Sequence, residues 1–186
     1  VNTAGVREHE QVTDNAPLRG GKQTPQEGGL RIPLIVKGPG IQTAKVNDSI
    51  VSLIDLLPTF MDMAGMPAQP ALELDGCNLL PLFKGQAKAA LLADGSVRDT
   101  LYFHYPIINP LASAIRKGDW KLILNYAPEA NGGKEATLYR LQNDDGSFAD
   151  LGEATDLADR YPEVRDDLLN DLGAHLAAYD AAIPYK

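Results

Sequence analysis

A single lysine stands on a glycine-rich stretch near the start of the chain. Gly20 and Gly21 lead into Lys22, and a second glycine pair, Gly28-Gly29, follows shortly after it. Glycine permits close backbone approach and unusual dihedral angles, so such a stretch favours a tight loop. A compact ammonium group on a tight loop is a fixed point charge. The pattern therefore predicts that Lys22 meets an anion.

Other chemistries that this stretch and its surroundings could support do not match. A Walker A loop needs glycine at position 16 and Ser or Thr at position 23, where Ala16 and Gln23 stand. An EF-hand built on Gly146 would need Asp in place of Leu141, so residues 143–146 are interpreted as a turn. No Gly-x-Ser-x-Gly elbow occurs. The three histidines lack metal-ligand spacing and lie far apart, at His9, His104 and His175.

The segments after the loop give a scaffold of mixed character. The apolar run Leu30–Val36 predicts a buried strand, and residues 46–51 are expected to continue its sheet. Asp55, Pro58 and Gly65 suit the beginning, first turn and end of a helix over 55–65. Residues 74–85 are expected to form a turn and a short helix.

The sequence pattern changes near Thr100. Residues 101–105 predict an aromatic strand, and 112–116 and 120–126 flank Lys117-Gly-Asp119, which is typical of a hairpin turn. Residues 137–141 suggest one more strand. Pro162 suits the first position of a final helix. Its expected apolar face consists of Val164, Leu168, Leu172, His175, Leu176, Tyr179 and Ile183. We therefore expect an antiparallel sheet packed by one C-terminal helix.

Composition excludes several classes of protein. The 186 residues are 44% hydrophobic, enough for a packed core. A formal net charge of −8 argues against a nucleic-acid partner, which requires clustered Lys and Arg. No apolar run is long enough for a membrane span. With one cysteine, Cys77, no internal disulfide can form, and we expect it to be a small buried core residue.

Five blocks of the sequence occur in the order found in one enzyme family. Residues 15–36 contain Gly-Lys followed by Glu-Gly-Gly and an apolar run, and they resemble the sulfatase family. The further blocks that are similar to this family are 52–59, 74–82, 101–123 and 138–158. The resemblance departs locally: the family usually has Gly after the lysine and an aromatic residue before the Glu, where Gln23 and Gln26 stand, and residues 145–151 form an extra surface turn.

The resemblance implies an α/β, alkaline-phosphatase-like fold that hydrolyses sulfate esters with a formylglycine and a calcium ion. The family's nucleophile motif is Cys or Ser, with Pro two residues later and Arg four residues later. This motif does not occur here. Asp14-Asn15 lies too close to Lys22 to be assigned as the family's Asp-Asn metal pair. We therefore expect the chain to be the C-terminal part of a sulfatase, inactive alone, with no metal ligand identified. Residues 1–99 would complete the α/β core, and 100–186 would form an α+β subdomain.

The resemblance also implies roles for single residues. Lys22 is expected to be catalytic, because a fixed cation stabilises charge on the leaving oxygen of a sulfate ester. His104 is expected to bind substrate, although a satisfied structural histidine is the alternative. Arg19 is interpreted as structural or as support for an anion. Arg116, Lys117 and Lys121 surround a hairpin and are expected to be solvated.

The expected ligand is a sulfated small molecule or glycan, and the resemblance implies a periplasmic or secreted protein. The oligomeric state stays open. Two other functions also remain open. One is a phosphodiesterase or phosphonate hydrolase of the same superfamily, and the other is a non-catalytic glycan-binding module formed by residues 100–186.

Overall fold

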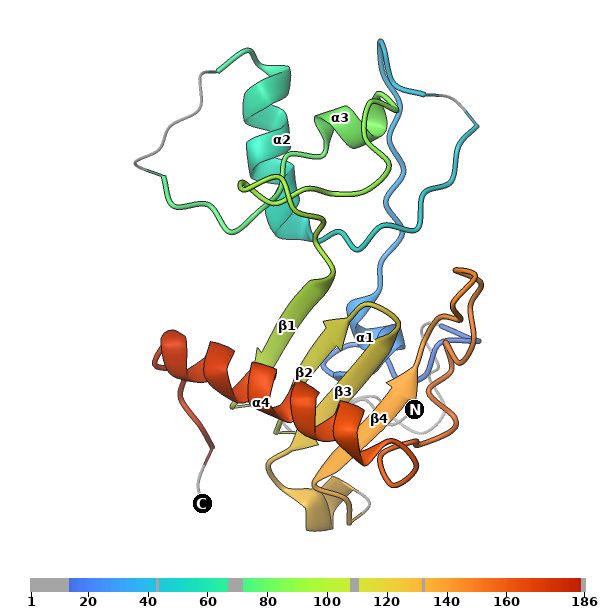
Figure 1. Cartoon of the computed structure of the whole chain (residues 1–186), viewed down its shortest axis with the longest axis vertical. Helices are drawn as coiled ribbons and strands as arrows, with labels where there is room; N and C mark the ends of the chain where they lie inside the picture. The colour runs from blue at the N-terminus through green and yellow to red at the C-terminus, as the bar shows by residue number, and fades with distance from the viewer. Residues whose placement is uncertain (1–13, 43, 67–71, 108–110, 132, 185–186) are drawn as a thin grey trace. The chain divides into compact units, whose positions relative to one another are not determined.

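The computed structural model describes residues 14–42, 44–66, 72–107, 111–131 and 133–184 (Figure 1). The chain forms two compact units. One joins the chain up to Ile32 with everything from Thr100 onward, and the other is Pro33–Asp99. The segment that carries Lys22 therefore packs with the C-terminal sheet. The assignment of residues 1–99 to the core of a larger α/β fold stays a prediction.

The first unit is built on a four-stranded antiparallel sheet in the order β1-β2-β3-β4 (Figure 1). The strands are β1 (Thr100–Tyr105), β2 (Ala112–Lys117), β3 (Trp120–Asn125) and β4 (Ala136–Arg140). Lys117 pairs with Trp120 across the predicted hairpin turn, where Gly118 takes a positive φ of 54°. The antiparallel sheet expected from the sequence is thus confirmed.

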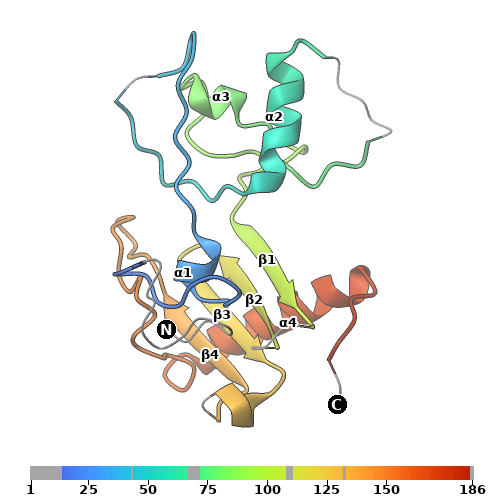
Figure 2. The same cartoon turned by 180° about the vertical axis from the view of Figure 1, so that it is seen from behind.

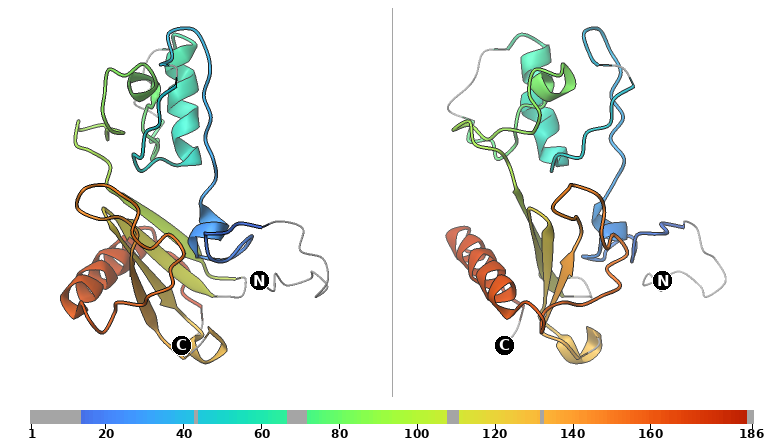
Figure 3. Two further views of the ribbon diagram at one scale, coloured as in Figure 1. Left: turned by 90° about the vertical axis from the view of Figure 1, so that its right-hand side faces the viewer. Right: turned by 45° about the vertical axis from the view of Figure 1, so that its right-hand side comes forward.

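One face of this sheet is covered by α4 (Pro162–Ala178), as Figure 3 shows. Leu168, Leu172 and Leu176 are buried against strand residues such as Ile115 and Leu122. Pro162 begins the helix, as predicted. Truncating a leucine buried in such a seam typically costs about 2–5 kcal/mol of stability. The predicted apolar face is confirmed within α4. Tyr179 and Ile183, which were also assigned to that face, lie after the end of the helix and are exposed.

The other face of the sheet has its own apolar layer, and the N-terminal segment lies over it. Ala114, Ile123 and Tyr139 are buried there, on the side opposite α4. Seen from behind, α1 (Glu27–Leu30) and the loop before it lie across the strands on this side (Figure 2). Because side chains alternate along a strand, Lys121 shares this face with Ile123. The sheet thus separates two layers of different character.

The unit Pro33–Asp99 is organised by a buried carboxylate. It contains the 3₁₀ helix η1 (Leu53–Asp55), α2 (Leu56–Met63) and α3 (Leu80–Phe83), which confirms the predicted helices. Asp55 is fully buried and accepts hydrogen bonds from Ser52 N, Cys77 N and Arg98 Nη1 at 2.7–2.8 Å. Cys77 is buried as expected. None of the helices in the described ranges has the length and hydropathy to cross a membrane.

The predicted strand over Leu30–Val36 is wrong. Leu30 ends α1, the residues after it form no regular structure, and Ile35 is 90% exposed. Residues 46–51 likewise form no strand. An apolar run becomes a strand only beside hydrogen-bonding partners, and no strand lies next to these segments in the described residues. The apolar pattern of a segment does not show whether a partner strand lies beside it.

Candidate active-site loop and its buried ion cluster

The predicted tight loop around Lys22 is present, and it is closed by its own backbone. Gly28 N donates to Arg19 O at 2.7 Å, so the two ends of the loop meet. Inside it, Thr24 Oγ1 donates to Gly21 O at 2.8 Å and accepts from Gly21 N at 3.1 Å. Lys22 is exposed at the tip. The loop therefore presents one ammonium group to solvent on a constrained backbone.

The glycines are required by close backbone approach. A Cβ on Gly28 would lie 2.6 Å from Arg19 O, and one on Gly29 would press on the carbonyl of Thr24. Side chains at these two positions would open the loop. Gln23, next to Lys22, has a φ of 70°, a left-handed conformation that favours glycine. The resemblance implied glycine at this position, and the structure gives the physical reason.

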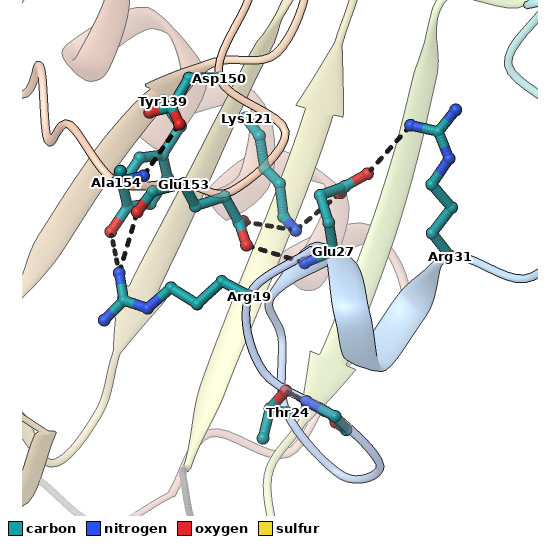
Figure 4. A network of polar contacts seen from close by, with 10 residues as sticks. Arg19, Thr24, Glu27, Arg31, Lys121, Tyr139, Asp150, Glu153 and Ala154 are labelled. Atoms are coloured by element: carbon teal, nitrogen blue, oxygen red, sulfur yellow. Dashed lines mark hydrogen bonds and ion pairs between the residues drawn. The ribbon is translucent and has the colours of Figure 1, made fainter. Parts of the chain in front are cut away.

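The loop is joined to the sheet by a buried cluster of three charges (Figure 4). Lys121 Nζ on β3 lies 2.9 Å from Glu27 Oε1 and 2.8 Å from Glu153 Oε1. The Lys121 and Glu153 side chains are completely buried, and that of Glu27 is 5% exposed. Glu153 Oε2 accepts a hydrogen bond from Glu27 N at 2.8 Å. The expectation that Lys121 is solvated is therefore wrong, because its ammonium group lies between two carboxylates.

Burial shifts the pKa of two groups at this site, Glu153 and Arg116. Removal from water raises the pKa of Glu153 above its usual range, and the charge of Lys121 opposes that rise. Arg116 on β2 lies opposite Lys121 on β3 in the strand register. Burial lowers the pKa of Arg116. Arg116 is thus only partly solvated, whereas the Lys117 side chain is 45% exposed and pairs with Asp171 at 2.6 Å. Of the hairpin cations, only Lys117 is mainly solvated as expected.

The turn that carries Glu153 is also tied to the loop. Arg19 Nη1 donates to the carbonyl oxygen of Glu153 at 3.0 Å and to Tyr139 Oη at 3.4 Å. The Asp150 carboxylate accepts from Ala154 N and Thr155 N, both at 2.9 Å. Arg19 thus has the structural role that was one of its two interpretations. Asp150, from the extra turn of residues 145–151, supports the position of Glu153.

His104 lies apart from the Lys22 loop, on the α4 side of the sheet. Tyr102, two residues earlier on β1, packs into the α4 layer, so alternation places His104 on the same face. Its Nδ1 lies 2.6 Å from Ser113 Oγ, and its Nε2 lies 2.9 Å from Ala182 O. Both ring nitrogens are occupied, and the structure does not bring His104 and Lys22 together. A substrate-binding role for His104 stays a prediction.

Of the other two histidines, the structure describes only His175. His175 stacks on Tyr102 with 3.7 Å between ring centroids, in line with its predicted position on the helix face. His9 lies outside the described residues. Within those residues, no group of three His, Cys, Asp or Glu side chains could hold a metal ion. Glu27 and Glu153 already share an ammonium group, so these two carboxylates do not fit a calcium site.

Sequence reasoning missed the three members of the cluster, although one signal was present. Lys121 interrupts an apolar strand at a position that alternation assigns to the face of Ile123. A lysine on a buried face requires an acidic partner. Its partners, Glu27 and Glu153, are remote in sequence, and only the fold reveals them.

Comparison with solved structures identifies the class of fold. The structure of Ps i-CgsB matches with a TM-score of 0.65 and 24% sequence identity, over 87% of this chain and 32% of that chain. Ps i-CgsB in complex with k-i-k-neocarrahexaose matches with a TM-score of 0.65 and 25% identity over the same shares. The fold of this chain thus occurs as one part of these longer proteins.

The curated relatives are sulfatases. Arylsulfatase K from Bos taurus is 32% identical over 79% of this chain and 26% of its own length. A sulfatase from Formosa agariphila is 33% identical over 81% of this chain and 27% of its own length. The chain therefore spans about a quarter of the length of these relatives. The family profile described as N-sulphoglucosamine sulphohydrolase, C-terminal, matches residues 21–174, and the chain belongs to this sulfatase family.

Proposed function

We propose that this chain is part of a sulfuric ester hydrolase and that it contributes Lys22 to the site where the ester is cleaved. The sulfatase family membership supports the reaction class. The observation that carries the assignment of Lys22 is its place at the exposed tip of a loop whose base is closed and anchored by buried charges.

The reaction explains why a fixed cation is useful. Hydrolysis breaks the bond between sulfur and the ester oxygen, and negative charge grows on the leaving oxygen until it takes a proton. An ammonium group already in place stabilises that charge without reorganisation in the transition state. The nucleophile and the metal of such an enzyme would come from outside these residues, so the 186-residue chain alone should be inactive.

We further propose that the substrate is a sulfated sugar or a small sulfate ester. The complex of the structural neighbour Ps i-CgsB with k-i-k-neocarrahexaose supports a carbohydrate. The names of the curated relatives support sulfatase chemistry. The choice between a sugar and a simple aryl ester can be made by comparing turnover of the two classes.

The test is steady-state hydrolysis of p-nitrophenyl sulfate by the catalytically competent protein that contains this chain. Replacing Lys22 by Ala should lower kcat/KM by about 10²–10³, the usual cost of losing one such electrostatic group. Lys37→Ala is the matched control, because Lys37 is also an exposed lysine but lies outside the loop. Unchanged turnover in K22A would remove Lys22 from the site. Turnover above background by the 186-residue chain alone would overturn the proposal that the nucleophile lies elsewhere.

A further inference from the structure

Glu153 contacts the Lys22 loop on both sides of the lysine. Its Oε2 accepts a hydrogen bond from Glu27 N, which follows Lys22 in the chain, at 2.8 Å. Its carbonyl oxygen accepts one from Arg19 Nη1, which precedes Lys22, at 3.0 Å. Figure 4 shows the two contacts converging on this one residue. Glu153 therefore fixes both the beginning and the end of the loop.

Glu153 occupies an unfavourable conformation and environment. Its φ is 50°, a left-handed value that non-glycine residues rarely adopt, and its side chain is completely buried. Burial raises the pKa of its carboxyl group. Such a residue persists only where its surroundings impose the conformation, and residues of this kind are common at functional sites. Here Asp150 imposes it, by accepting hydrogen bonds from the two N–H groups that follow Glu153.

Lys121 connects this arrangement to a rigid element. Its ammonium group lies between Glu27 and Glu153, while its backbone belongs to β3, one of the two inner strands of the sheet. The cluster thus holds the base of the loop against the sheet. The Lys22 ammonium group is exposed and takes no part in any contact described for the cluster. The cluster can therefore act on a bound anion through the position of the loop.

We propose that Glu153 is a positioning residue, which acts through Glu27 and Arg19 to hold the Lys22 ammonium group where the leaving oxygen of a sulfate ester gains charge. This inference rests on the proposed function of Lys22. Displacement of a catalytic group by about 1 Å can cost about 100-fold in rate. Loss of the Glu153 contacts should therefore reduce catalysis without removing any group that touches the substrate.

A double-mutant cycle with Lys22→Ala and Glu153→Gln tests the inference, using kcat and KM for p-nitrophenyl sulfate in the catalytically competent protein. Glu153→Gln keeps the size of the side chain but removes its charge. Alone it should lower kcat by about 10- to 100-fold, with little change in KM. In the K22A background it should change kcat by less than about 2-fold, because residues that act as a unit are not additive.

Each other outcome has a distinct meaning. An equal loss of kcat from Glu153→Gln in both backgrounds would show a general structural role and overturn the inference. Unchanged kcat in E153Q, with a loss in K22A, would also overturn it but leave the proposed function intact. If K22A alone is unchanged, the proposed function fails. Glu129→Gln, at an exposed glutamate, is the control and should leave kcat unchanged.

A second variant and a second measurement cover the case in which E153Q does not fold. Asp150→Asn weakens the support of the Glu153 turn and leaves all three charges of the cluster in place. The same cycle with D150N should show a smaller loss that again depends on Lys22. In the 186-residue chain, D150N should speed hydrogen–deuterium exchange across residues 19–29, whereas E129Q should not. A loss with D150N that does not depend on Lys22, or unchanged exchange, would overturn the inference.

Discussion

At the scale of single residues, Lys121 has its charge compensated inside the protein. An ammonium group removed from water needs nearby carboxylates, and Lys121 has two within 2.9 Å. Removing one member of a buried ion pair typically costs about 3–5 kcal/mol, because the remaining charge loses its partner. Glu27, Lys121 and Glu153 therefore depend on one another. The residues next to Lys22 affect the stability of the loop through their backbone conformation.

Gln23 gives a prediction at this scale. Its φ of 70° is a conformation in which a Cβ is unfavourable, by about 1–2 kcal/mol. Replacing Gln23 by Gly should therefore raise the free energy of unfolding by about 1 kcal/mol, after allowing for the greater entropy of glycine in the unfolded chain. Urea unfolding of the 186-residue chain measures this change.

Gln26→Gly is the matched control for Gln23→Gly. Gln26 belongs to the same loop but has an ordinary φ of −73°, so glycine should lower stability there. Equal effects of the two substitutions would show that the left-handed backbone at Gln23 carries no strain.

At the scale of elements, Asp156 links β4 to the segment that leads into α4. Its carboxylate accepts from Leu138 N at 3.1 Å, Ala158 N at 3.0 Å and Lys134 Nζ at 2.6 Å. Burial acts to raise the pKa of this carboxyl group, but these hydrogen bonds outweigh it and the pKa lies below its usual range. The junction is therefore stabilised by the ionised form.

The pH dependence of this junction follows from that direction. A carboxyl group whose pKa is lowered by folding stabilises the fold above its unfolded value of about 3.9, and the contribution is lost as pH falls through the folded pKa. Asp156→Asn should therefore lower the free energy of unfolding by about 1 kcal/mol at pH 7. The difference should shrink towards pH 3, as measured by urea unfolding at both pH values.

Asp159→Asn is the control for the junction. The Asp159 side chain is 89% exposed and lies 3.6 Å from Lys134, so its loss should change stability little. A deficit in D156N that is the same at pH 7 and pH 3 would contradict the role given to the ionised carboxylate.

The elements also show what sequence reasoning could reach. The strands from Thr100 onward, α2 and α4 were predictable, because hairpin turns, caps and apolar periodicity are local signals. The strand predicted for Leu30–Val36 was wrong, because a strand depends on partners that no local signal records. The same limit explains the site. Lys22 could be found from its glycines, but Glu27 and Glu153 meet across 126 positions of sequence.

At the scale of the whole molecule, large exposed apolar side chains are concentrated in the unit Pro33–Asp99. On and just before α2, Leu53, Leu57 and Phe60 are each more than half exposed. Contiguous apolar surface of this kind promotes association in water. We expect the 186-residue chain to self-associate, as measured by sedimentation velocity across a range of concentrations.

A double substitution locates the surface responsible for association. Leu57→Glu together with Phe60→Glu should shift the chain towards monomer without lowering its melting temperature, because both side chains are already exposed. Ile107→Glu is the control: it changes an 84% exposed side chain in the other unit and should leave association unchanged. A wild-type chain that is monomeric at all concentrations would contradict this prediction.

The cluster of Glu27, Lys121 and Glu153 has a consequence for recombining this protein with its relatives. The three positions belong to α1, to β3 and to the turn after β4, so any crossover between Ile32 and Thr100 separates Glu27 from its two partners. A chimera that takes the lysine loop from one parent and the sheet from another would keep its ion balance only if both parents carry matching charges. Transferring the loop to another scaffold therefore requires that all three residues be transferred together, although they come from distant parts of the chain.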